Sequence, residues 1–219
     1  MAKILGERYI IPTIGVYKKA EEIEWDSLPN QFVLKANHDS GSVVVCKDKG
    51  TFDKAKAVRK LRKALNQDSY KPFREWAYKN VKRCIIAETY LEDESGTELK
   101  DYKIFCFNGE PRMIQLDYSR FNGHKRNLYT TDWQRLDVEY NNPTDKDRVF
   151  NKPVSLGEML EAAKKLSAGL PFVRADFYDV NGSVYFGELT FYPEGGFGWF
   201  KPESFDKELG SWLKLPTIE

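Results

Sequence analysis

Two strand-forming runs joined by an Asn-Gly turn constrain the fold of this chain more than any other segment. They span residues 172–191, FVRADFYDVNGSVYFGELTF, and are rich in aromatic and β-branched residues. They carry the polar residues Arg174, Asp176, Glu188 and Thr190. A carboxylate inside such a run is costly without a partner, so these acids are expected to be ion-paired or metal-bound. A solvated strand face with a salt bridge stays open as the alternative.

The parity of the turn decides whether these side chains share a face. Opposed residues of an antiparallel hairpin lie on the same face, and neighbours alternate. A two-residue turn at Asn181-Gly182 would oppose Asp176 to Gly187 and send Glu188 to the other face. We therefore predict an odd loop of residues 180–182 with a left-handed glycine. Acids on opposite faces would exclude a shared metal site.

The composition describes a globular protein without a bulk polyanion partner. The chain has 219 residues, 31% of them charged, and a formal net charge of +1, so we expect no nucleic-acid partner. No apolar run is long enough to span a bilayer, and the N-terminus lacks the pattern of a signal peptide, so we expect a cytoplasmic protein without membrane insertion. Cys46, Cys84 and Cys106 lack the spacing of zinc ligands and are predicted to be buried reduced thiols.

The hydrophobic pattern predicts an α+β fold of two lobes with antiparallel sheets and a hinge within residues 88–98. Residues 1–30 are expected to be a remnant of, or a linker from, an N-terminal substrate region. Residues 31–91 are predicted to form the small lobe with a glycine-containing phosphate loop. Residues 92–219 are predicted to form the large lobe, which carries the metal and catalytic residues.

Local signals place several helices and turns. Asp53 can cap a basic helix, whose lysines and arginines form a solvated face or, as the alternative, a nucleic-acid or membrane contact. Pro72 indicates a second, short amphipathic helix. Asn108-Gly109 joins the runs DYKIFCF and EPRMIQLDYSR into another hairpin. Ser155 and Glu158 form a capping box that opens a helix near residue 156.

Two lysines lie on apolar strands. Lys35 ends one strand and is followed by a polar loop with Ser40 and Gly41, where an ammonium and loop amides can hold phosphates. Alone, Lys35 also fits a snorkelling strand-end lysine. Lys103 lies in DYKIFCF and shares a face with Asp101.

Four phrases occur in one order: LPNQFVLKANHDSG, DYKIFCFNGEPRMIQLDYSR, HKRNLYTTDW and VRADFYDVNGSVYFGELTFYPEGG. With this order and wording, the chain resembles the ATP-grasp superfamily and, within it, the teichuronopeptide-biosynthesis (TupA-like) group, over roughly residues 5–215. The resemblance implies two α+β lobes that grip ATP at their interface. It also implies ATP and magnesium as cofactors.

The resemblance implies a role for each matching residue. It assigns ATP binding to Lys35, Ser40, Gly41, Glu88, Tyr90, Leu91 and Lys103, catalysis to Lys103, Arg174, Gly195 and Gly196, and magnesium binding to Asp176, Glu188 and Thr190. Thr190 stands where the superfamily usually has Asn, which leaves a second magnesium ion open. The acid that binds the ribose stays open among Glu92, Asp93, Glu94 and Glu98.

A basic segment follows the second hairpin, with Arg120, His124, Lys125 and Arg126. Arginine presents a planar fork that matches carboxylates and phosphates, so this segment is a candidate for binding the acceptor. A solvated loop is the alternative.

The activity that the resemblance implies is an ADP-forming carboxylate–amine ligase that acts through an acyl phosphate. Its substrates would be a uronic-acid glycan and an amino acid, in surface polysaccharide or glycopeptide biosynthesis. The alternatives are an ATP-grasp-fold kinase with a hydroxyl acceptor and a non-catalytic nucleotide- or glycan-binding module. Because only 34 residues precede Lys35, we expect a second subunit, a partner protein or further sequence to complete the acceptor site.

Overall fold

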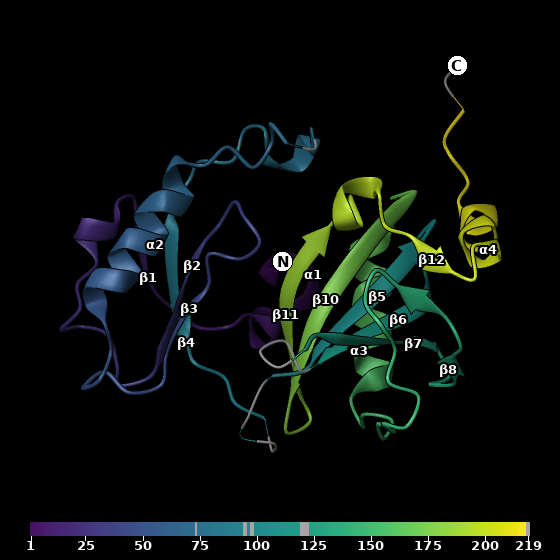
Figure 1. Ribbon diagram of the computed structural model, residues 1–219, viewed down its shortest axis with the longest axis horizontal. Coiled ribbons are helices and arrows are strands. Elements are labelled where there is room, and N and C mark those ends of the chain that lie inside the picture. The colour runs from purple at the N-terminus through teal and green to yellow at the C-terminus, as the bar shows by residue number, and fades with distance from the viewer. Residues whose placement is uncertain (73, 94–95, 97–98, 119–122, 218–219) are drawn as a thin grey trace. The chain divides into compact units, whose positions relative to one another are not determined.

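The computed structural model describes residues 1–72, 74–93, 96, 99–118 and 123–217 (Figure 1). The chain forms two compact units. The small unit is the continuous segment Ile11–Leu91, and the large unit combines Met1–Ile10 with Glu92–Glu219. No helix in the described ranges is long and apolar enough to cross a bilayer.

The small unit is a four-stranded antiparallel sheet with one long helix on one face. The strand order is β1 (Thr13–Tyr17), β4 (Ile85–Thr89), β2 (Phe32–Ala36) and β3 (Val44–Cys46). Buried and half-buried residues alternate along β2, so one face of the sheet enters the core. Helix α2 (Lys54–Asn66) covers that face with Leu61, and the Asp53 carboxylate accepts a hydrogen bond from the Lys56 amide at 2.8 Å, which confirms the predicted cap.

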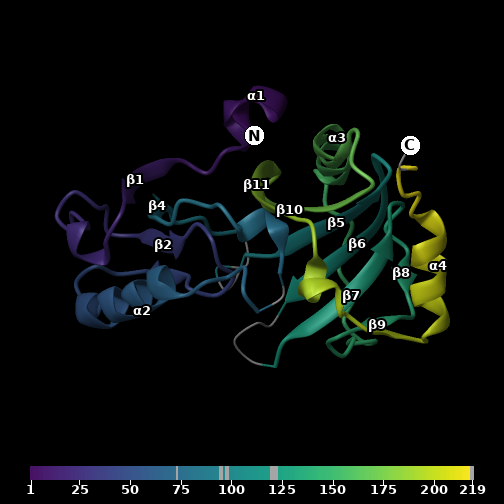
Figure 2. The same ribbon diagram turned by 90° about the horizontal axis from the view of Figure 1, so that it is seen from above.

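The large unit is built on a six-stranded antiparallel sheet. Its order is β11 (Ser183–Thr190), β10 (Phe172–Val180), β5 (Asp101–Phe107), β6 (Glu110–Tyr118), β7 (Lys125–Thr130) and β8 (Arg135–Leu136). Helix α3 (Leu156–Ser167) covers one face, as Figure 2 shows, and packs its apolar side on residues such as Ile104, Ile114 and Ala175. The asparagine and glycine of the Asn108-Gly109 turn have φ values of 50° and 83°, as the hairpin prediction requires.

The opposite face of the large sheet is partly apolar and partly charged. Helix α4 (Ser204–Trp212) and the short strands β9 (Glu139–Tyr140) and β12 (Phe200–Lys201) pack on its apolar part, with Phe105, Phe107 and Met113. The charged part carries most of the side chains described below.

The N-terminal residues do not form a region of their own. Strand β1 pairs with β4 in the small sheet. The preceding residues, with α1 (Ala2–Leu5) and η1 (Glu7–Tyr9), belong to the large unit, where Tyr9 is buried and Arg8 Nη2 lies 2.9 Å from Glu158 Oε1. Residues 11–30, which the sequence prediction set apart, thus belong to the small unit.

Three local predictions were wrong. The helix expected from Pro72 is only a 3₁₀ turn, η3 (Trp76–Tyr78). Ser155 precedes α3, but its hydroxyl donates to Asp179 Oδ2 at 2.5 Å and does not cap the helix. Cys84 is half-buried, whereas the other two cysteines are fully buried.

Candidate active site

The hairpin of β10 and β11 places Asp176 opposite Glu188 by a route that the sequence did not predict. Val180 pairs with Ser183, so the turn contains only Asn181 and Gly182, and the predicted odd loop was wrong. The register shifts between Asp176 and Phe177, because Phe177 pairs with Phe186 and Gly187 is left over as a β-bulge. The two acids share a face as predicted, but the extra residue that this requires lies in the bulge at Gly187 and not in the turn.

Five charged or polar residues converge on that face of the large sheet. Asp176, only 1% exposed, accepts hydrogen bonds from Lys103 Nζ at 2.5 Å and from Arg174 Nε and Nη2 at 2.8 Å each. Arg174 Nη2 also donates to Thr190 Oγ1 at 3.0 Å and to Glu188 Oε1 at 3.3 Å. The structure therefore brings together the lysine, arginine and three metal-ligand candidates that the sequence had predicted. We call these five residues the Asp176 cluster.

Sheet register explains why Lys103 reaches Asp176. The two residues are directly opposed on β5 and β10, and opposed residues share a face. Asp101, two residues earlier on β5, lies on the same face, and its Oδ2 is 2.9 Å from Lys103 Nζ. The ammonium therefore lies within ion-pair distance of two buried carboxylates.

Burial and charge act in opposite directions on this cluster. Burial raises the pKa of the Asp176 carboxyl, but Lys103 and Arg174 together outweigh it and hold this pKa below its usual value. Burial likewise lowers the pKa of Arg174, and the charges of Asp176 and Glu188 raise it above its usual value. With Asp101 included, two cations face three carboxylates, so the group has a formal charge of −1 and can accept a divalent cation.

The oxygen donors on this face fit a magnesium ion. Magnesium is usually held by one or two carboxylates and completes its shell with water and substrate phosphates. Asp176, Glu188 and Thr190 offer two carboxylates and a hydroxyl, and the Glu188 side chain is 50% exposed. Among the described residues no group of three His, Cys, Asp or Glu side chains forms a metal cage, so a metal here would share its shell with other ligands.

A second buried ion pair lies on the same face and was missed by the sequence analysis. Arg126 Nε lies 2.8 Å from Asp117 Oδ1 on β6, and both residues are less than 5% exposed. Arg126 Nη1 donates to the Tyr140 carbonyl at 3.0 Å and to Glu194 Oε1 at 3.2 Å. Gln115 donates to both Asp117 oxygens at 3.0 Å. Polar and apolar residues alternate at Gln115, Leu116 and Asp117 in β6, beside Asp101 in the neighbouring strand. This pattern is the sequence signal that could have predicted a polar cluster here.

The basic segment is therefore not a simple loop. Lys125 and Arg126 begin β7, and the fork of Arg126 is already engaged by Asp117. His124 is partly exposed, with Nε2 3.5 Å from Asp117 Oδ1. Arg120, also predicted to bind the acceptor, lies outside the described residues.

The glycine loop after β11 has a left-handed backbone. In η4 (Pro193–Gly196), φ is 54° at Glu194, 65° at Gly195 and 82° at Gly196. Three successive left-handed residues are costly except at glycine, which accounts for the Gly-Gly pair. The ion pair of Glu194 with Arg126 holds this loop against the large sheet.

The predicted nucleotide residues of the small unit form a separate group. Lys35 Nζ lies 2.7 Å from Glu88 Oε2, because β2 and β4 are neighbours. The pair lies on the face of the small sheet that α2 does not cover. Ser40 and Gly41 lie in the loop between β2 and β3, and Lys47 Nζ is 5.7 Å from the Tyr90 ring centre.

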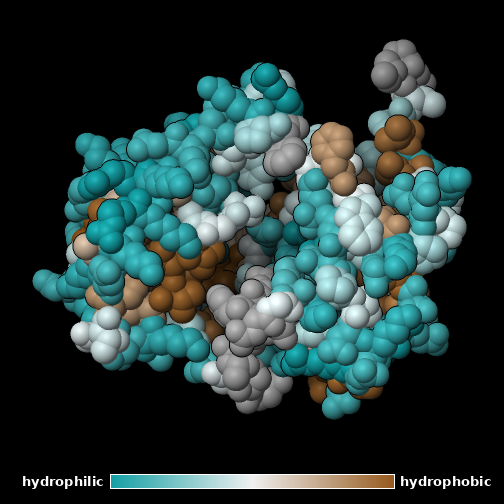
Figure 3. Space-filling view, viewed as in Figure 1, coloured by the Kyte–Doolittle hydropathy of each residue, from teal (hydrophilic) through white to brown (hydrophobic). Residues whose placement is uncertain are grey.

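The surface around this pair is mixed in character. Apolar side chains gather over β2 and β3 in Figure 3. Val45 in β3 and Val43 just before it are both exposed. Leu91, the last residue of the small unit, is half-buried. Of the candidates for the acid that binds the ribose, Asp93 is buried and its Oδ2 lies 3.0 Å from Lys100 Nζ, whereas Glu92 is exposed. The other two candidates, Glu94 and Glu98, lie outside the described residues.

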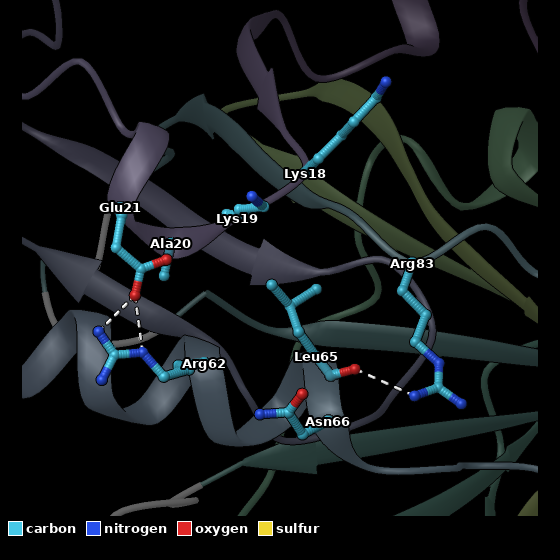
Figure 4. A pocket seen from close by; sticks show the side chains of 8 residues that line it. All are labelled: Lys18, Lys19, Ala20, Glu21, Arg62, Leu65, Asn66 and Arg83. Atoms are coloured by element: carbon cyan, nitrogen blue, oxygen red, sulfur yellow. Dashed lines mark hydrogen bonds and ion pairs between the residues drawn. The ribbon is translucent and has the colours of Figure 1, made fainter.

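A small basic groove of about 260 Å³ lies elsewhere on the small unit (Figure 4). Its cationic side chains are Lys18, Lys19, Arg62 and Arg83. Figure 4 shows Arg62 turned toward Glu21 and Arg83 toward the Leu65 carbonyl, which accepts at 3.0 Å. None of the residues that the sequence had predicted for the site lines this groove.

Several solved structures are similar to this chain. Among solved structures, the chain is similar to D-alanine–D-alanine ligase from Bacillus anthracis complexed with ATP, with 18% identity, a TM-score of 0.47, and coverage of 86% of this chain and 50% of that chain. D-cycloserine synthetase DcsG gives 16% identity and a TM-score of 0.44, and the match covers 85% of this chain and 59% of that chain. N5-carboxyaminoimidazole synthetase from Staphylococcus aureus gives 14% identity and a TM-score of 0.46, and the match covers 86% of this chain and 41% of that chain.

The chain thus spans 41–59% of the length of these three structures. A search of curated proteins gives no match. Residues 1–214 match the family described as TupA-like ATPgrasp, which confirms the resemblance seen in the sequence. With this match over nearly its whole length and with its two antiparallel α+β units, the chain belongs to the TupA-like ATP-grasp family.

Proposed function

We propose that this protein is an ATP- and magnesium-dependent ligase that joins a carboxylate to an amine through an acyl phosphate. The observation that carries the proposal is the Asp176 cluster, in which two buried cations and two opposed acids share one sheet face. Phosphoryl transfer needs positioned groups that neutralise charge, and little covalent chemistry from the protein. The family match supports the same reaction class.

The residues of the cluster would divide the work by charge. Asp176 and Glu188, with Thr190, would hold magnesium, which when bound neutralises phosphate oxygens. Lys103 and Arg174 now neutralise Asp176. With the Asp176 carboxylate engaged by magnesium, the Lys103 ammonium and the Arg174 guanidinium would be able to bind the transferring phosphoryl group. The amine would then displace phosphate from the acyl phosphate, and ADP and phosphate would leave.

The resemblance to the teichuronopeptide group supports a finer proposal for the substrates. The carboxylate would belong to a uronic-acid glycan and the amine to an amino acid, as in the synthesis of a surface polysaccharide or glycopeptide. In this proposal Lys35 and Glu88 of the small unit contribute to nucleotide binding, with the backbone of Gly195 and Gly196 near the acyl-phosphate oxygens.

Incubation with magnesium, ATP and paired panels of carboxylates and amines tests the reaction. A ligase releases ADP and phosphate and yields a product whose mass is the sum of both substrates less one water. Phosphate retained on the acceptor would identify a kinase, and nucleotide binding without turnover would identify a binding module.

Glu188→Gln tests the site, because it keeps the shape of the side chain but removes the charge that binds metal. Glu110→Gln is the matched control, since the two glutamates are 50% and 52% exposed and each has one cationic partner. Turnover should collapse in the first variant and persist in the second, with both folded. Full turnover by folded Glu188→Gln protein would contradict the proposed site.

A further inference from the structure

We propose that Gly187 is a positioning residue, whose missing side chain lets the bulge in β11 hold Asp176 and Glu188 together. The inference rests on the proposed function, in which these two acids act on one metal ion. It concerns a residue that neither donates to a ligand nor lies at the turn.

The turn makes the bulge necessary. Two residues, Asn181 and Gly182, separate the strands, and uninterrupted pairing from that turn would oppose residue 187 to Asp176. Glu188 would then oppose Ala175, which is fully buried in the core beneath α3. A carboxylate is strongly disfavoured there. The bulge at Gly187 absorbs the extra residue, so Leu189 opposes Ala175 and Glu188 opposes Asp176.

The space at the bulge favours glycine. A Cβ atom at residue 187 would lie 3.2 Å from the carbonyl oxygen of Asp176 and 3.3 Å from Cε2 of Tyr178. Both distances are shorter than ordinary van der Waals contacts, and the first neighbour is backbone that cannot rotate away. The backbone of Gly187 is not left-handed, so the advantage of glycine here comes from space and not from conformation.

The close contact is with Asp176 itself, the residue at the centre of the cluster. A side chain at residue 187 would push β11 away from the Asp176 carbonyl. Because Asp176 is held by Lys103 and Arg174, this displacement would change the spacing between its carboxylate and that of Glu188. Changes in residues that support metal ligands lower metal affinity by about 10–100-fold.

Binding of Mn²⁺ in the presence of saturating ADP tests the inference without turnover. Gly187→Ala should weaken Mn²⁺ binding about tenfold and Gly187→Val more, in protein that stays folded by circular dichroism. Gly157→Ala is the matched control, because a Cβ at that position in α3 meets no atom within 4 Å, and its affinity should equal that of the wild type. Wild-type affinity in folded Gly187→Val protein would overturn the inference.

Deletion of Gly187 provides a second test if the valine variant does not fold. Deletion makes Glu188 follow Phe186 directly, so regular pairing again opposes Glu188 to Asp176. The deletion variant should therefore bind Mn²⁺ within about threefold of the wild type, more tightly than Gly187→Ala. Loss of binding in a folded deletion variant would overturn the inference. If the wild type itself binds no Mn²⁺, the proposed function fails, which is a separate outcome.

Discussion

Lys103→Met should destabilise the large unit strongly, because the Lys103 ammonium neutralises two buried carboxylates. Its Nζ lies 2.5 Å from Asp176 Oδ2 and 2.9 Å from Asp101 Oδ2, and these aspartates are 1% and 3% exposed. Removing one partner of a buried ion pair costs about 3–5 kcal/mol. Arg174 remains bonded to Asp176 through two nitrogens, so we expect a loss of about 3 kcal/mol.

The size of this loss should depend on pH. The pKa of Asp176 is held low in the folded protein, so its contribution to stability is complete above the unfolded value of about 4 and is lost as the pH falls through the folded value. Without Lys103 one of the charges that lower this pKa is gone, so the pKa of Asp176 rises. The difference in unfolding free energy between the wild type and the variant should be largest near neutral pH and shrink below about pH 4.

Urea unfolding from pH 3 to pH 7 measures this difference, with Lys164→Met as the matched control. Lys164 Nζ lies 2.9 Å from Glu110 Oε1, a similar distance, but both side chains are 52% exposed, so the control should change little at any pH. Equal effects of the two substitutions, or an effect of Lys103→Met that does not change with pH, would refute the reasoning.

Two further predictions concern packing and thiol exposure. Gly198→Ala would place its Cβ against the ring of Tyr140, whose centroid lies 4.4 Å from that of the stacked Phe200 ring. Thermal unfolding should therefore show that the free energy of unfolding falls by about 1–3 kcal/mol. The control Gly210→Ala should show no loss, because its Cβ would meet no atom within 4 Å. Ellman's reagent at pH 8 should react with one thiol, Cys84, well before the other two, although partial burial raises the pKa of Cys84 as well. It should react with all three after unfolding, because burial shields the other two more fully and raises the pKa of Cys106 to about 12. Quick reaction of two thiols in the native protein would contradict this assignment.

The β10–β11 hairpin shows how far sequence alone determines this site. The density of aromatic and β-branched residues and the Asn-Gly pair located both strands and the turn. The alternation of side chains between the two strand faces predicted that one extra residue lies between Asp176 and Glu188, but it did not predict the position of that residue. Its position at Gly187 depends on the close approach to the Asp176 carbonyl, which is a property of the folded strand pair.

Other predictions failed where a distant partner competed with a local signal. The spacing of Ser155 and Glu158 fits a capping box, yet the hydroxyl bonds to Asp179, 24 residues away on another element. The ion pair of Arg126 with Asp117 was not predicted, because it depends on the pairing of β6 with β7. By contrast, Asp53 caps α2 as predicted, because that interaction lies within four residues of sequence.

The division of the large unit into two chain segments sets an order for its assembly on the ribosome. The small unit, Ile11–Leu91, is continuous and is fully synthesised early, whereas Arg8 acquires its partner Glu158 only when α3 has been made, about 150 residues later. At 5–20 residues per second this interval is roughly 8–30 s. During this interval the buried position of Tyr9 does not yet exist, so residues 1–10 emerge before the small unit but join the large unit only after α3 has been made.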